Sequence, residues 1–173
     1  MQFFFEPKKK DAEKEAAVEE VLLDGYDRYY RLAYSYVGNP DDAGDIVQEG
    51  AYKAIKNSQS LQNIEYAGTW VYRIMLNEVF SFCRKRKEQS TGEMDSIECG
   101  REDRYENVDL TRALEVLDEK DRAVVILRYF EDYKLGEIAQ ILDDNINTTK
   151  SRLYRSIKKL RLQLDNDWIW EEA

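Results

Sequence analysis

Apolar side chains recur three or four residues apart through most of this sequence, a spacing that places them on one face of an α-helix. The clearest stripe consists of Val18, Leu22, Tyr26, Tyr29 and Ala33. It predicts a helix over residues 11–37. Only two prolines and eight glycines occur among 173 residues, so little interrupts such stripes. Because no segment shows the alternation of a half-buried strand, the sequence predicts an all-α fold.

Capping residues mark the next helix boundaries. Asn39 followed by Pro40 supplies an N-cap and a first-turn proline, which predicts a second helix over residues 40–57. After a polar loop, Asn63 is placed to cap a third helix. That helix is expected to end in the basic run 84–87.

The stretch 89–106 has the composition of a linker, with glycine, serine and threonine but few apolar residues. Eight acidic side chains stand against two arginines between residues 88 and 109. We therefore expect two small helical domains, residues 11–88 and 107–166, joined by an acidic flexible linker.

A net charge of −9 would argue against a nucleic-acid partner if the charge were evenly spread. It is not, because residues 145–164 contain six basic side chains and no acidic one. The run 84–87 is a second basic block. The charge distribution thus predicts two cationic surfaces on an acidic protein.

Several classes of function are excluded or disfavoured. The chain has no histidine, which rules out histidine zinc sites, histidine general bases and serine–histidine triads. Asp41, Asp45 and Glu49 share a helical spacing, but no further metal ligands accompany them, so we expect no metal and no cofactor. Cys83 and Cys99 lie in different settings, and we expect them to stay reduced. The sequence favours a protein that is not an enzyme.

The apolar runs are far shorter than the roughly 20 residues that span a bilayer. The phenylalanines at positions 3–5 are followed by lysines and not by the apolar core of a signal peptide. We expect a cytoplasmic protein without direct membrane insertion.

Two amphipathic segments near the C-terminus are joined by the polar turn 143–145, a pattern typical of a helix-turn-helix. If Thr149, Leu153 and Ile157 face inward, the helical period exposes a basic, hydrogen-bonding face. Its members are Asn147, Thr148, Lys150, Ser151, Tyr154, Arg155 and Lys158. Such a face suits the major groove of DNA, whereas the alternative is an ordinary solvated helix surface.

Residues 132–164 resemble region four of bacterial sigma factors, most clearly in Ile-Ala at 138–139 and in Lys-Ser-Arg at 150–152. The first half resembles region two of the same proteins in Asp-Ile-Val-Gln-Glu at 45–49 and in Trp-Val-Tyr-Arg-Ile at 70–74. The chain is thus similar to the two-domain extracytoplasmic-function group of the sigma-70 family. The resemblance implies a region-two helical bundle and a region-four helix-turn-helix.

The resemblance also implies roles for individual residues. Polymerase binding falls on Asp45, Gln48 and Glu49. Recognition and melting of the minus-ten element fall on Leu61, Trp70, Arg73, Asn77, Arg84, Lys85 and Arg86, although Trp70 at this spacing is also typical of a core residue. Recognition of the minus-thirty-five element falls on Lys150, Ser151, Arg152, Tyr154, Arg155 and Lys158.

Some positions depart from the family pattern. Lys134 stands where a serine or threonine usually caps the first helix of the motif, and Asp144 occupies a turn position that is usually apolar. Ile146 is a candidate to replace the lost apolar contact. Thr149 stands where an aliphatic residue normally packs. These departures concern the turn geometry and the promoter sequence that is read.

The implied function is a transcription initiation factor that binds core RNA polymerase and promoter DNA, with an anti-sigma factor as a further partner that the family admits. A stand-alone helix-turn-helix regulator is the alternative. Such a regulator would not need a helix that binds polymerase, so the Asp45, Gln48 and Glu49 helix discriminates between the two hypotheses. A helical scaffold that binds only proteins is a third reading, and it predicts no salt-sensitive affinity for DNA.

Overall fold

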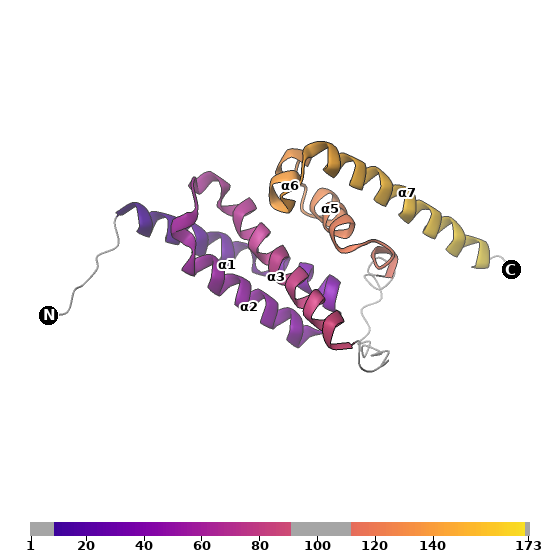
Figure 1. Cartoon of the computed structure of the whole chain (residues 1–173), viewed down its shortest axis with the longest axis horizontal. Helices are drawn as coiled ribbons and strands as arrows, with labels where there is room; N and C mark the ends of the chain where they lie inside the picture. Colours follow the sequence, from indigo (N-terminus) through magenta and orange to yellow (C-terminus); the bar gives the residue numbers. More distant parts are fainter. Residues whose placement is uncertain (1–8, 91–111, 172–173) are drawn as a thin grey trace. The chain divides into compact units, whose positions relative to one another are not determined.

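The computed structural model describes residues 9–90 and 112–171, and every regular element in these ranges is helical (Figure 1). The all-α prediction is therefore confirmed. The chain divides into two compact units, residues 1–97 and 98–173. Most of the expected linker, together with Cys99, lies outside the described residues.

The first unit contains three long helices that each contact the other two. They are α1 (Lys9–Val37), α2 (Pro40–Lys56) and α3 (Ala67–Gln89), with the short 3-10 turns η1 (Ser58–Ser60) and η2 (Ile64–Tyr66) between α2 and α3. Figure 1 shows the three helices side by side.

Asn39 caps α2 as its sequence position predicts. Its Oδ1 atom accepts hydrogen bonds from the backbone N–H groups of Asp41 and Asp42, at 2.8 and 3.1 Å. Asn63 behaves differently, because it accepts from the N–H of Glu65 and caps η2 instead of the third helix. That helix begins only at Ala67, since a 3-10 turn comes first.

Close packing holds the first unit together. The rings of Tyr29 on α1 and Tyr72 on α3 meet edge to face, with centroids 5.5 Å apart. Gly50 lets α2 approach α3, because a Cβ atom there would lie 2.5 Å from the Sδ atom of Met75. A side chain at residue 50 would therefore require the Met75 side chain to move.

The second unit is built from α5 (Glu119–Tyr129), α6 (Leu135–Leu142) and α7 (Ile146–Glu171), which contact one another. Asp118 caps α5 by accepting from the N–H of Asp121 at 2.8 Å. The apolar core includes Ala123, Val124, Leu127, Ile138, Ala139 and Leu142. Among the described helices, none has the length and apolar character needed to cross a membrane.

The turn between α6 and α7 is tight. Asp143 adopts a left-handed conformation with φ of 55°, and the N–H of Asp144 donates to the carbonyl of Ala139 at 2.9 Å. Asn145 then begins α7, because its Oδ1 accepts from the N–H of Asn147 at 2.7 Å. The turn fixes where the exposed face of α7 starts.

Candidate protein and nucleic-acid interfaces

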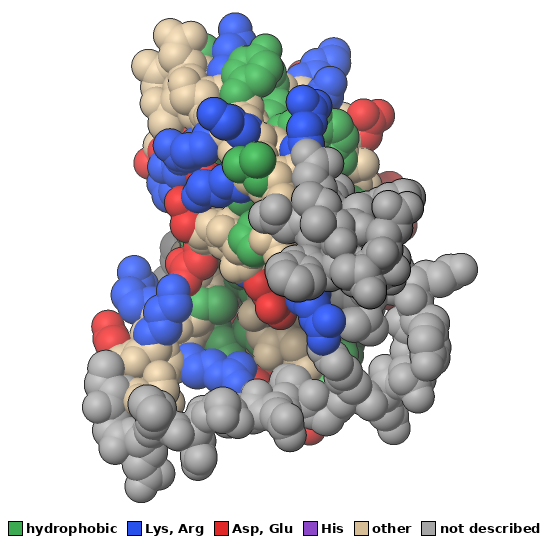
Figure 2. Space-filling view, turned by 90° about the vertical axis from the view of Figure 1, so that its right-hand side faces the viewer, with side chains coloured by type: hydrophobic (Ala, Val, Ile, Leu, Met, Phe, Trp, Pro, Cys, Tyr) green, Lys and Arg blue, Asp and Glu red, His purple; other side chains and the backbone are tan. Residues whose placement is uncertain are grey.

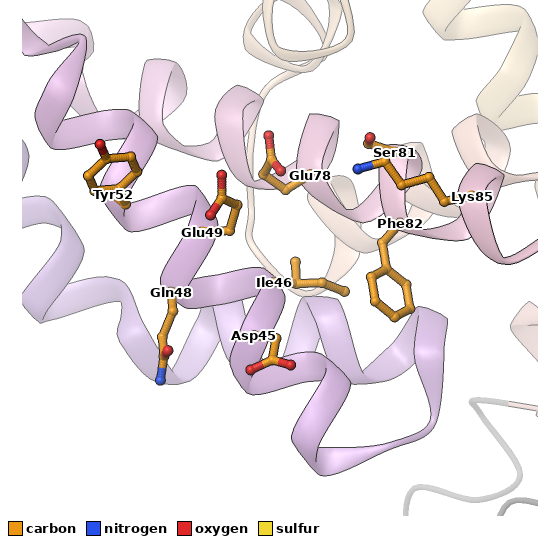
Figure 3. A pocket seen from close by; sticks show the side chains of 9 residues that line it. All are labelled: Asp45, Ile46, Gln48, Glu49, Tyr52, Glu78, Ser81, Phe82 and Lys85. Carbon is orange, nitrogen blue, oxygen red and sulfur yellow. The ribbon is translucent and has the colours of Figure 1, made fainter.

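A groove of about 530 Å³ runs between α2 and α3 (Figure 3). The three residues assigned to polymerase binding, Asp45, Gln48 and Glu49, all line it and are exposed. Phe82, which is half-buried, supplies apolar surface in the same groove, and Ile46, only 4% exposed, also lines it. The groove therefore combines carboxylates, an amide and an apolar patch, a set suited to a basic helical surface of another protein.

Lys53 links the two acidic sides of this region. Its Nζ atom lies 2.8 Å from Oε1 of Glu78 on α3 and 3.3 Å from Oε1 of Glu49 one turn earlier on α2. The hydrogen bond to Glu78, together with the charges of both glutamates, raises the pKa of Lys53. Only the Glu49–Lys53 spacing was visible in the sequence, because Glu78 is 25 residues away.

The residues assigned to the minus-ten element differ in how far they are exposed. Arg73 and Asn77 are exposed on α3, and Trp70 is half-buried one turn before Arg73. Leu61, also assigned to this element, is only 2% exposed. Because its side chain is part of the core, it supports the loop from within and does not present a surface to a base.

The basic end of α3 is partly neutralised. Arg84 and Lys85 are exposed, whereas Arg86 is half-buried. The Nη1 atom of Arg86 donates to the carbonyl of Val37 at 3.4 Å and lies 3.8 Å from Oδ2 of Asp42. Arg84 and Lys85 are therefore better placed than Arg86 to meet a phosphate backbone.

The first turns of α7 present the face that the helical period predicts. Thr149 and Ser156 are buried, and their hydroxyls donate to the carbonyls of Asn145 and Arg152, four residues earlier in each case. The exposed positions are Asn147, Thr148, Lys150, Ser151, Tyr154, Arg155 and Lys158. On the surface drawn in Figure 2, Lys and Arg side chains gather in clusters with a smaller number of carboxylates between them.

Arg152 does not belong to that exposed face, and its assignment as a DNA contact stays a prediction. Its side chain is 20% exposed and donates to Asp121 at 3.0 Å and to Asp144 at 3.1 Å. Lys120 also pairs with Asp144, at 3.2 Å. The sequence pattern does not reveal these ion pairs, because the partners of Arg152 lie 8 and 31 residues away, beyond any helical spacing.

The sequence analysis did not identify Asp121 as a residue of this site. Its side chain is 0% exposed, and it receives hydrogen bonds from both Arg152 and Arg155. Burial alone would raise the pKa of its carboxyl, but hydrogen bonds and charge from the two arginines outweigh burial and lower the pKa. The carboxylate therefore stays ionised at neutral pH.

The departures from the family pattern have local explanations. The N–H of Lys134 donates to Oε2 of Glu137 at 2.8 Å, so half of a capping box remains at the start of α6. Asp144 replaces an apolar contact with two ion pairs. Ile146 does not restore that contact, since 45% of it is exposed.

Two family models match the chain: Sigma-70 region 2 over residues 24–89 and Sigma-70, region 4 over residues 107–160. Sigma factor SigV of Bacillus subtilis is 42% identical over 163 residues, which cover 92% of this chain and 98% of SigV. The chain belongs to the sigma-70 family. Sigma factors are transcription initiation factors that bind core RNA polymerase and promoter DNA, so a stand-alone regulator is not favoured.

Two further comparisons support the same family assignment for this sigma factor. The extracytoplasmic-function sigma factor SigW of Bacillus subtilis is 30% identical, over 83% of this chain and 87% of SigW. A solved structure of RpoE in complex with the anti-sigma factor NepR, from Bartonella quintana, superposes with a TM-score of 0.71 at 27% identity. It covers 85% of this chain and 96% of that chain.

Proposed function

We propose that the two units of this sigma factor divide the work of initiation. The first unit docks on core RNA polymerase and recognises and melts the minus-ten element, and the second reads the minus-thirty-five element. The observation that carries the proposal is the exposed basic face of α7 in a protein whose α2 presents an acidic groove. The sigma factor performs no covalent chemistry itself and acts in the cytoplasm with the polymerase.

Docking uses the groove between α2 and α3. Asp45 and Glu49 supply charge for lysines and arginines of a polymerase helix, and Gln48 supplies an amide that donates and accepts. Phe82 supplies the apolar contact that a purely electrostatic surface would lack. Charge complementarity of this kind sets the rate and orientation of association.

Minus-ten recognition uses the exposed face of α3. The amide of Asn77 can read a base edge, while Arg73 and Trp70 can stack on a base that has left the duplex. Arg84 and Lys85 would hold the phosphate backbone through charge alone. Leu61, buried under the preceding loop, keeps that loop in place.

Minus-thirty-five recognition uses the first turns of α7. Lys150, Ser151, Tyr154 and Arg155 are exposed near the start of the helix, where a recognition helix reaches base edges. Lys158 lies further along and would bind phosphate. Arg152 braces the helix from its half-buried position.

An anti-sigma factor is a proposed partner as well. The support is the likeness to RpoE, whose structure was solved in complex with the anti-sigma factor NepR. A partner of that class would restrain the sigma factor by competing with polymerase or promoter for the surfaces described above.

Run-off transcription with purified core RNA polymerase and a library of genomic fragments tests the proposal. Replacing both Lys150 and Arg155 by alanine is expected to abolish promoter-specific transcripts while the protein still co-purifies with core polymerase. The matched control removes two exposed charges elsewhere in the second unit, through Arg112→Ala and Lys134→Ala. Equal loss of transcription and of core binding in the α7 variant would contradict the division of labour.

A further inference from the structure

The buried carboxylate of Asp121 meets two arginines of α7 with different geometries. Arg155 donates from Nε to Oδ2 at 3.1 Å and from Nη2 to Oδ1 at 2.9 Å. Arg152 donates from Nη1 to Oδ1 at 3.0 Å. A carboxylate without exposure to water costs free energy unless it is fully compensated, and these three hydrogen bonds compensate it. Asp121 thereby fixes the orientation of both guanidinium groups.

The Arg155 guanidinium donates hydrogen bonds to Asp121 along one of its two edges only. A guanidinium carries five N–H donors in a planar fork, so it can form two pairs of parallel hydrogen bonds at once. The Nε and Nη2 edge is taken by Asp121, and no other hydrogen-bond acceptor among the described residues meets Arg155. Because 52% of the side chain is exposed, the outer edge, formed by Nη1 and the second N–H of Nη2, is open to solvent.

Arg152 has no such open edge. It is held between Asp121 and Asp144, and Lys120 extends the chain of charges beyond Asp144. The ion pairs therefore run from Lys120 through Arg152 to Arg155, and only the last member has both a fixed orientation and an accessible fork. Arg155 is therefore the member suited to contact DNA, whereas Arg152 and Lys120 hold the helix in position.

We propose that Asp121 is a positioning residue that sets the base specificity of the minus-thirty-five interface by aiming the outer edge of Arg155 at a base. This inference rests on the proposed role of Arg155 in DNA recognition. An arginine fork held in place matches the O6 and N7 atoms of guanine, whereas a mobile arginine loses rotamer entropy on binding. The paired carboxylate also offsets part of the attraction to phosphate, which carries no sequence information.

The test uses the full-length sigma factor with core RNA polymerase and a promoter library randomised over the minus-thirty-five element. Arg155→Ala is expected to flatten the base preference at the contacted base pair by about tenfold, the size of one bidentate contact. Asp121→Asn is expected to flatten the preference at the same base pair. The base preference of the double variant should be no weaker than that of Arg155→Ala alone, because both changes remove the same contact.

Asp132→Asn is the matched control. It makes the same chemical change at an exposed aspartate of the second unit, and asparagine accepts the φ of 56° found there. It is expected to keep the full base preference. Circular dichroism of each variant shows whether the helices are retained.

The outcomes separate this inference from the proposed function. If Asp121→Asn lowers transcription from all library members equally and leaves the preference intact, the positioning role is overturned while Arg155 remains a DNA contact. If Arg155→Ala itself leaves the profile unchanged, both assignments fail. Should Asp121→Asn not fold, Arg155→Lys replaces it, because lysine keeps the charge but has no second edge. A preference retained in Arg155→Lys would then overturn the inference.

Discussion

Lys53 on α2 and Glu78 on α3 form an ion pair, with 2.8 Å between Nζ and Oε1, at the edge of the groove assigned to polymerase docking. Glu49 shares the same lysine. Replacing Lys53 by methionine should leave the two glutamates mutually repelling. Because 42% of the Lys53 side chain is exposed to solvent, the expected loss of unfolding free energy is only about 0.5 kcal/mol. Chemical denaturation followed by circular dichroism measures it.

The same lysine gives a prediction for alkaline pH. The pKa of Lys53 is raised in the folded protein, so its stabilising contribution is complete below the pKa of the unfolded chain, about 10.4. It is lost as the pH rises through the folded value. The difference in unfolding free energy between wild type and Lys53→Met should therefore be constant near neutral pH and shrink above about pH 10. A difference that grows at high pH would contradict the ion-pair assignment.

Charge reversal in the groove tests polymerase docking. Asp45→Lys is expected to weaken binding of core RNA polymerase by about tenfold or more, since it sets like charges against each other. Fluorescence anisotropy of labelled sigma factor with core polymerase measures this affinity. Glu19→Lys, at an exposed position of α1 outside the groove, is the control and should bind as wild type does.

Asn77→Ala tests promoter melting. Loss of the amide should reduce formation of the open complex by about tenfold, the cost of one base-edge contact, while the closed complex still forms. Permanganate reactivity of unpaired thymines reports melting, and a gel shift of the closed complex reports binding. Loss of both steps to the same degree would remove Asn77 from the minus-ten interface.

The buried carboxylate of the second unit gives a prediction at acid pH. The pKa of Asp121 is lowered on folding, so its contribution is complete above the unfolded value of about 3.9 and is lost as the pH falls through the folded value. Asp121→Asn should cost about 1–3 kcal/mol of unfolding free energy at neutral pH. That difference should narrow below about pH 4. Urea denaturation of wild type and Asp121→Asn across the acid range measures whether the difference in unfolding free energy narrows.

Local signals in the sequence predicted most of the fold. Asn39 and Pro40 marked the start of α2, and the apolar period over residues 11–37 marked α1, because both depend on neighbours within one or two turns. The same kind of reasoning placed Tyr154 on the exposed face of α7. Positions fixed by nearby residues were thus within reach of the sequence alone.

Contacts between residues far apart in the chain could not be predicted from the sequence. Asp121 lies 34 residues before Arg155, and no periodicity connects them. Leu61 is assigned to the minus-ten element by the family resemblance, but it lies between two 3-10 turns and its side chain is buried in the core. Tertiary packing decides both positions, so neither the burial of Leu61 nor the ion pairs of Asp121 could be predicted from the sequence.

Photo-crosslinking from two exposed tyrosines tests the central claim most directly. Tyr154 on α7 is 76% exposed, and Tyr52, which lines the groove of α2, is 59% exposed. Each is replaced in turn by the aromatic photo-crosslinker benzoylphenylalanine, in full-length protein bound to core polymerase and a promoter. The account predicts crosslinks from residue 154 to DNA at the minus-thirty-five element and from residue 52 to the largest polymerase subunit. Crosslinks from residue 154 to protein alone, or from residue 52 to promoter DNA, would contradict it.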